Sequence, residues 1–140
     1  MIEPRVEFVN FNIIGDERGS LISLENSHNI GFDIKRMYYI YGTQKNISRG
    51  FHAHKKLKQL LIAVSGTVDI YCEYQNVKQT FSLNSPSIGL IIEGPVWRIM
   101  QNFSEDSVLI VLADGFYDEN DYIREYDHFL CETQKGYKNA

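Results

Sequence analysis

Two histidines separated by one residue are the feature of this sequence best suited to chemistry. His52 and His54 lie in the run RGFHAHKK at positions 49–56. Alternate side chains of a β-strand point to the same face, so a strand here would place both imidazoles together. A lone strand histidine is more often a core residue, but two of them beside Arg49 and Lys56 favour a polar pocket. Imidazole titrates near neutral pH, so the pair indicates proton transfer.

The strand that carries these histidines is one of many short predicted strands. Aromatic residues make up 13% of the chain, and they suit half-buried pleated surfaces. Further segments with strand-like patterns are residues 6–12, 21–25, 34–41, 60–64, 68–74, 78–83, 88–93, 97–103 and 108–113. Turn residues separate these segments, and no linker or repeat divides them. The pattern predicts one all-β domain over residues 1–140, a sandwich or barrel.

The C-terminal part of the chain has the pattern of an amphipathic helix. Between residues 119 and 131 the apolar positions follow the spacing of one helix face. These positions are Tyr122, Ile123, Tyr126, Phe129 and Leu130. Asp118 is the expected N-cap. We expect the helix to pack on the barrel or on a partner subunit, and we assign it no chemistry.

Composition and charge exclude several functional classes. The chain has 140 residues and a formal net charge of −4, which argues against binding nucleic-acid phosphates. Two cysteines are too few for a disulfide scaffold or a cysteine metal site. No signal peptide is visible, and the apolar runs are too short to span a membrane. We therefore expect a cytoplasmic protein.

The spacing around the histidines resembles the first motif of the cupin superfamily. A metal-binding cupin uses two histidines, a glutamate and a histidine from a second motif as ligands. In this sequence Gln59 and Arg98 stand at the last two positions. Arginine has only donors and stays charged, so it is no ligand and repels a cation. The cavity is therefore expected to hold an anion or a polar organic substrate, and no metal.

A closer resemblance covers nearly the whole chain. Four runs carry it in order: KRMYYI at 35–40, the histidine run at 49–56, GPVWR at 94–98 and YDENDYIREY at 117–126. They are similar to the dTDP-4-oxo-6-deoxyglucose 3,4-ketoisomerases, small metal-independent cupins. The resemblance implies a cupin jelly-roll barrel with a short C-terminal helix and no cofactor. It also implies the reaction, in which the ketone of a dTDP-linked 4-oxo-6-deoxyhexose moves from C-4 to C-3 through an enediolate, in dTDP-amino-sugar biosynthesis.

The resemblance implies catalytic roles for three residues. His52 is expected to remove the C-3 proton and His54 to be its partner in the proton shuttle. The sequence itself does not separate these two roles. Tyr38 is expected to present its hydroxyl to the sugar oxygens.

Substrate binding is assigned mainly to cations in or beside the matched runs. The expected binding residues are Arg18, Arg36, Arg49, Lys56, Gln59 and Arg98. Arg49 is expected at the pyrophosphate, because a guanidinium fork suits phosphate. Arg98 is expected deep in the barrel, near the sugar, because a lone buried charge is costly without an anionic partner. Trp97 is expected to fill the barrel.

Three other functions fit parts of the pattern. A dTDP-4-oxo-6-deoxyglucose 3,5-epimerase shares the R-G-F-H strand, but such enzymes are longer and pair the histidine with an aspartate, and no aspartate here aligns obviously with that role. A non-catalytic sugar-nucleotide-binding cupin would use the pocket without turnover. A metal-dependent oxygenase is disfavoured by Gln59 and Arg98. By analogy with small cupins that hide strand edges by pairing, we expect a homodimer.

Overall fold

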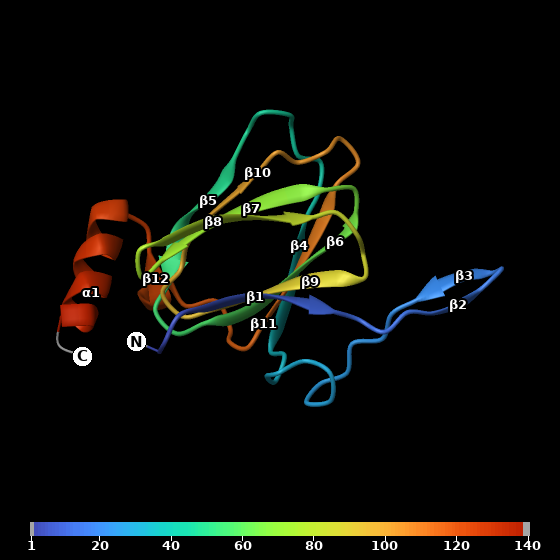
Figure 1. Ribbon diagram of the computed structural model, residues 1–140, viewed down its shortest axis with the longest axis horizontal. Coiled ribbons are helices and arrows are strands. Elements are labelled where there is room, and N and C mark those ends of the chain that lie inside the picture. Colours follow the sequence, from blue (N-terminus) through green and yellow to red (C-terminus); the bar gives the residue numbers. More distant parts are fainter. Residues whose placement is uncertain (1, 139–140) are drawn as a thin grey trace.

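Two five-stranded antiparallel sheets face each other in the computed structural model, which describes residues 2–138 (Figure 1). The first sheet has the order β1 (Arg5–Asn10), β9 (Ile88–Glu93), β6 (Lys58–Ser65), β11 (Val108–Ala113) and β4 (Arg36–Ile40). The second has the order β12 (Tyr122–Ile123), β5 (Arg49–His54), β10 (Trp97–Gln101), β7 (Val68–Tyr74) and β8 (Val77–Leu83). The predicted all-β class is confirmed.

The chain passes repeatedly from one sheet to the other, as it does in a jelly roll. The two sheets are not closed into a continuous barrel, because β4 ends the first sheet and β12 ends the second. The opening between the β4 edge and the β12–β5 edge leads to the interior. The site described below lies along this opening.

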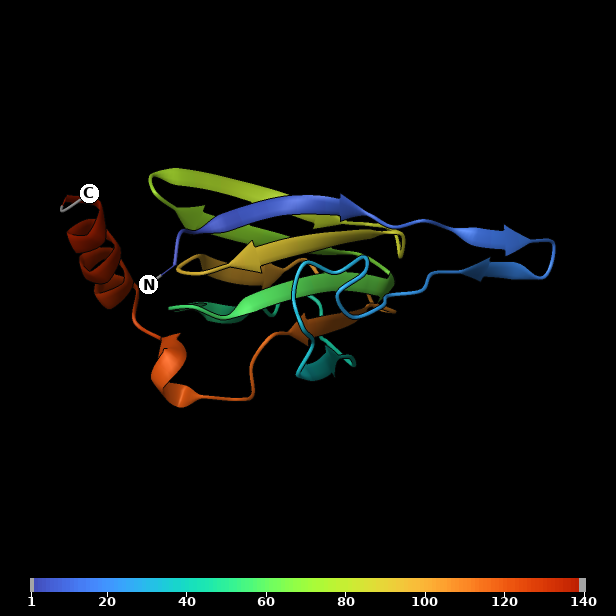
Figure 2. The ribbon, with the colours of Figure 1, turned by 90° about the horizontal axis from the view of Figure 1, so that it is seen from below.

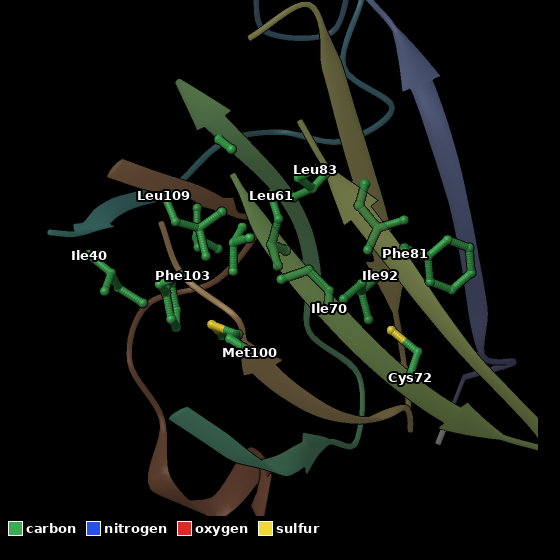
Figure 3. Packing of buried hydrophobic residues seen from close by; sticks show 14 of the residues in the cluster. Ile40, Leu61, Ile70, Cys72, Phe81, Leu83, Ile92, Met100, Phe103 and Leu109 are labelled. Atoms are coloured by element: carbon green, nitrogen blue, oxygen red, sulfur yellow. The ribbon is translucent and has the colours of Figure 1, made fainter. Parts of the chain in front are cut away.

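Aliphatic and aromatic side chains fill the space between the sheets (Figure 3). The run of apolar residues in β6 reflects burial of both of its faces. Leu61 points into the core between the sheets, whereas Leu60 and Ile62 face a second cluster on the outside of the first sheet. Residues of the segment 22–34 cover that outer cluster.

Strand prediction is most accurate where the alternation is bounded by clear turns. The predicted bounds of β7, β9 and β11 are confirmed. The strand predicted over residues 21–25 is wrong, because β3 (Gly19–Leu21) ends where that strand was to begin. Ile22 and Leu24 alternate like strand residues, yet they pack on the outer face of the first sheet.

A hairpin of β2 (Ile14–Asp16) and β3 extends away from both sheets, at the end of the molecule opposite the C-terminal helix (Figure 2). Its apolar residues Ile13, Ile14 and Leu21 are 55%, 57% and 56% exposed. Arg18 lies in the turn of this hairpin and donates to Asp16 from Nε at 3.0 Å.

The predicted C-terminal helix is confirmed in type but not in position. Residues 119–121 form a 3-10 turn, η1 (Glu119–Asp121), which Asp118 caps by accepting from the Asn120 amide at 3.0 Å. The strand β12 follows, and α1 (Tyr126–Lys138) begins only after it. The helical spacing is misleading because Tyr122 and Ile123 pair with β5.

The helix packs on the outer face of the second sheet. Trp97 lies there as well, with its ring centroid 5.8 Å from that of Phe129. The prediction that Trp97 fills the barrel is therefore wrong. Alternation along β10 turns Trp97 outward and Arg98 inward. None of the helices within residues 2–138 is long and apolar enough to cross a membrane.

Candidate active site

A bulge in β5 sets the direction of the two histidines. Arg98 of β10 pairs with His52, but the next residue of β10 pairs with Gly50, so Phe51 is the extra residue. Gly50 and Phe51 have positive φ angles of 99° and 56°, a conformation that L-residues rarely adopt. Past the bulge, His52 and His54 share the inner face, with ring centroids 5.0 Å apart.

His54 is held by an aspartate that the sequence analysis did not place in the site. Its Nδ1 lies 3.1 Å from Oδ2 of Asp121, and the Lys56 amide donates to Oδ1 of the same carboxylate at 3.0 Å. Nδ1–H therefore faces Asp121, and Nε2 faces the interior with its lone pair. No aspartate aligned obviously with such a role in the sequence, and the structure places Asp121 in it.

Tyr122 closes the other side of the histidine pair. Its ring centroid lies 4.3 Å from that of His54 and 5.1 Å from that of His52. The Arg124 guanidinium stacks over the same ring at 4.1 Å and donates to Glu119 from Nε at 2.6 Å. The matched run at 117–126 pointed to this segment, but its helical spacing concealed that Tyr122 pairs with β5.

A buried polar chain leads from Arg98 to Tyr38. Arg98 and Gln59 are each only 1% exposed. Arg98 donates from Nη1 to Oε1 of Gln59, and Gln59 donates from Nε2 to the Tyr38 hydroxyl at 3.1 Å. Arg98 also donates from Nε to the Val96 carbonyl at 3.2 Å. The predicted deep position of Arg98 is confirmed.

The buried Arg98 and Gln59 side chains also make this site unfavourable for a metal cation. Gln59 and Arg98 stand where a metal-binding cupin has ligands, and a guanidinium offers donors only. Among the side chains that the structure describes, no group of three or more His, Cys, Asp or Glu residues is placed to hold a metal ion. The residues present therefore do not fit the cupin metal centre.

Burial and the Arg98 charge keep both imidazoles neutral. Burial is the larger cause and Arg98 the next, and together they lower the pKa of His52 to about 3. The same two causes lower the pKa of His54. Burial also raises the pKa of Tyr38, although Arg98 opposes this shift. The site therefore holds two neutral imidazoles and a protonated phenol around one buried positive charge.

Two adjoining cavities of about 340 Å³ and about 510 Å³ lie along the opening between β4 and β5. The smaller is lined by Tyr38, Arg49 and His52, and the larger by His54 and Lys56. Both are lined by Arg36 and Tyr122, and the smaller also by Arg124, which the sequence analysis did not select.

Arg18 does not join these residues within one chain. Its side chain is 86% exposed at the tip of the β2–β3 hairpin. The hairpin and the segment that carries β12 lie toward opposite ends of the molecule (Figures 1 and 2). Eight of the nine predicted site residues are thus gathered by the fold, and Arg18 is the exception.

Three buried polar atoms in the described part of the chain lack a hydrogen-bond partner: Arg36 Nε, His54 Nε2 and Arg98 Nη2. All three belong to residues of the site. Buried polar groups are almost always satisfied, so a cluster of unsatisfied ones indicates a place where a polar ligand completes them. Two of the atoms are cationic donors, and the third is an imidazole acceptor able to take a proton.

Comparison with known proteins agrees with this geometry. The family FdtA (WxcM-like, C-terminal) matches residues 4–134. The TDP-4-oxo-6-deoxy-alpha-D-glucose-3,4-oxoisomerase of Aneurinibacillus thermoaerophilus is 48% identical over 121 residues, which are 86% of this chain and 87% of the relative. The 3,4-ketoisomerase QdtA of Thermoanaerobacterium thermosaccharolyticum, solved in complex with TDP, is 45% identical with a TM-score of 0.92, covering 94% of this chain and 96% of that one.

A third relative is the TDP-quinovose 3,4-ketoisomerase WlaRB of Campylobacter jejuni, 48% identical with a TM-score of 0.86 over 90% of this chain and 97% of that one. The sugar epimerase ChmJ of Streptomyces bikiniensis is only 12% identical, with a TM-score of 0.71 over 84% of this chain and 67% of that one, which shows a shared fold alone.

The fold and the histidine-lined cavity are those of a sugar 3,4-ketoisomerase, an isomerase. The chain belongs to the FdtA family.

Proposed function

We propose that this protein converts TDP-4-oxo-6-deoxyglucose (TDP being the deoxythymidine diphosphate, dTDP) into a TDP-3-oxo-6-deoxyhexose. The relatives at 45–48% identity are named for this kind of reaction. The observation that carries the proposal is the pair of neutral imidazoles beside the unsatisfied guanidinium of Arg98. A carbonyl-adjacent proton transfer needs a neutral base and a positive group for the oxyanion that develops.

The reaction is a rearrangement in which the numbers of atoms and electrons do not change. We assign His52 as the base that takes the C-3 proton. The electron pair of the broken C–H bond forms the double bond of an enediolate. The negative charge then lies on the C-4 oxygen, where the Arg98 guanidinium stabilises it. The proton of the C-3 hydroxyl then moves to the C-4 oxygen, and an imidazole of the pair, protonated in the first step, delivers a proton to C-4, so that the ketone stands at C-3.

The remaining site residues are assigned to the shuttle and to binding. His54 is proposed as the partner of His52, since its Nε2 is free and its Nδ1 is held by Asp121. Arg49, Arg36 and Lys56 are proposed for the pyrophosphate, because all three line the cavities and carry positive charge.

We also infer that two copies of this chain form a homodimer. The exposed Ile13, Ile14 and Leu21 on a hairpin that leaves the body of its own chain favour burial against a second copy. In that arrangement the hairpin could carry Arg18 to the partner's cavity. The cytoplasmic location expected from the sequence remains a prediction.

Proton NMR of the sugar ring in D₂O tests the proposed function. Incubation with TDP-4-oxo-6-deoxyglucose is expected to yield the 3-oxo sugar with deuterium at C-4. We expect His52→Asn to lower kcat by about 10²- to 10⁴-fold, the usual contribution of a general base, and to leave TDP binding within about twofold. His128→Asn, on the exposed surface of α1, is the matched control.

The outcome of the same incubation separates the alternatives. The His54–Asp121 pair keeps the 3,5-epimerase in consideration, since that enzyme class pairs a histidine with an aspartate. Deuterium at C-3 and C-5 would support the epimerase. No deuterium incorporation would support a non-catalytic binding protein, and near-normal turnover by His52→Asn would contradict the base assignment.

A further inference from the structure

Gln59 lies behind the Tyr38 hydroxyl and lines neither cavity. It is only 1% exposed. Both ends of its amide are occupied, since Oε1 accepts from Arg98 and Nε2 donates to Tyr38. A side chain in this position can act on a substrate only through its two neighbours.

The donors of Arg98 determine which way the amide points. A guanidinium has no acceptor, so only the oxygen of Gln59 can face Arg98 without opposing two donors. The amide nitrogen must then face the Tyr38 hydroxyl, and it offers hydrogens only. The Tyr38 oxygen is therefore an acceptor toward Gln59.

The orientation of the Gln59 amide also determines where the phenolic proton of Tyr38 points. The Tyr38 hydroxyl has one hydrogen, and that hydrogen cannot point at Gln59 because the Gln59 amide nitrogen already donates to the hydroxyl oxygen. Among the described residues, Gln59 is the sole hydrogen-bond partner of the Tyr38 hydroxyl. Tyr38 lines the smaller cavity together with His52, so its O–H is free to point at a ligand there.

We propose that Gln59 is a positioning residue that makes Tyr38 an obligatory hydrogen-bond donor to a sugar oxygen. This inference rests on the proposed function, because it needs the ketose in the cavity beside His52. Charge relayed from Arg98 through the amide strengthens the donor, since hydrogen bonds in a chain polarise one another. The donor is most useful at the enediolate, where the oxygen it faces becomes negative.

The substitution Gln59→Glu reverses the polarity and keeps the shape. A carboxylate accepts from Arg98 and also accepts from Tyr38, which turns the phenolic proton away from the cavity. We expect kcat to fall by roughly 10²-fold, the usual cost of losing one oxyanion donor, and KM to rise by a smaller factor because the sugar also loses this hydrogen bond before it reacts. Gln79→Glu, the same substitution on the exposed face of β8, is the matched control and is expected to be active.

A double-mutant cycle with Tyr38→Phe separates this role from a structural one. If Gln59 acts through the hydroxyl, Gln59→Glu should lower kcat by no more than about threefold in the Tyr38→Phe background. A full loss in that background would mean that the substitution acts through Arg98 and would overturn the proposal. Wild-type activity of Gln59→Glu would overturn it as well.

Two further measurements keep the test independent of folding and of turnover. If Gln59→Glu does not fold, judged by TDP binding, Gln59→Met replaces it, and the same non-additivity with Tyr38→Phe is expected. The ratio of affinities for TDP-4-oxo-6-deoxyglucose and TDP needs no turnover, and it should fall equally in Gln59→Glu, Tyr38→Phe and the double variant. An inactive wild type would contradict the proposed function, whereas unequal affinity ratios would contradict the role of Gln59.

Discussion

At the scale of single residues, the carboxylate of Asp121 determines which nitrogen of His54 carries the proton. Oδ2 faces Nδ1 at 3.1 Å, and Oδ1 accepts from the Lys56 amide. Asp121→Asn can keep the bond to Lys56, but it then places an amide N–H against Nδ1. The ring must respond by moving its proton to Nε2, which removes the acceptor that faces the substrate.

We therefore expect Asp121→Asn to lower kcat by about 10²-fold or more, at the lower end of what general acid–base groups contribute. Steady-state kinetics with TDP-4-oxo-6-deoxyglucose would measure the effect. Asp127→Asn removes the same charge from an exposed position in the first turn of α1, so its kcat should match the wild type. Equal kcat values for both variants would show that turnover does not depend on which nitrogen of His54 carries the proton.

The neutral state of His52 also links stability to pH. Its pKa is about 3 in the folded protein, against an ordinary value of 6.5. Below pH 6.5 the unfolded chain binds a proton at this residue that the folded chain does not, so the free energy of unfolding falls as the pH falls toward 3.

The slope for one such proton reaches about 1.4 kcal/mol per pH unit once the unfolded histidine is protonated. Urea unfolding at several values between pH 7 and pH 5 should therefore show a shallower loss of stability for His52→Asn than for the wild type. Parallel curves for the two proteins would mean that His52 is protonated as readily in the folded state as in the unfolded chain.

Site residues could be predicted from sequence where their arrangement depends on neighbouring residues, and they were missed where it depends on contacts between distant segments. His52 and His54 were predicted to share a face because alternation along one strand is a local rule. Asp121 is sixty-seven positions from His54, and only the pairing of β12 with β5 brings them together. That pairing is a tertiary contact of two residues, too short to produce a strand pattern of its own.

At the scale of elements, the bulge in β5 determines where the histidines point. Gly50 has φ +99°, and an added Cβ would lie 3.0 Å from the Arg98 carbonyl oxygen. Gly50→Ala therefore both strains the backbone and presses on β10. We expect a loss of about 1–3 kcal/mol in stability, with a lower kcat because His52 is displaced.

Thermal unfolding and kinetics of Gly50→Ala would test this. Gly31→Ala is the matched control, because a Cβ there meets no atom within 4 Å and the residue has no positive φ. A Gly50→Ala variant as stable and as active as Gly31→Ala would show that the bulge is not needed to hold His52.

The type of an element could be predicted where a strand buries one face in a sheet. It was harder to predict where an apolar segment packs on a sheet without pairing with it, or pairs over only two residues. The segment 22–34 alternates, but it covers a sheet instead of joining it. Tyr122 and Ile123 fit a helical face, yet the backbone hydrogen bonds available on the β5 edge make them a strand. In both cases the hydrophobic pattern indicates burial correctly and leaves the partner undetermined.

At the scale of the whole molecule, Arg18 is the residue that one chain alone does not explain. It lies on the β2–β3 hairpin, away from the cluster of the other eight predicted site residues. If the hairpin enters the cavity of a second copy, each site combines Arg18 of one subunit with His52 of the other. Two variants, each inactive or weak alone, would then complement each other.

We expect Arg18→Ala to raise KM for the TDP-sugar and His52→Asn to lower kcat by about 10²- to 10⁴-fold, each as a homodimer. In a heterodimer of the two, one site carries both defects and the other carries neither. Random exchange of equal amounts gives heterodimers as half of all dimers, so about a quarter of all sites should be intact. Activity of the re-equilibrated mixture at low substrate concentration should rise toward that fraction of the wild type. A mixture no more active than the mean of its two components would show that Arg18 of one subunit does not complete the site of the other, even if the protein sediments as a dimer.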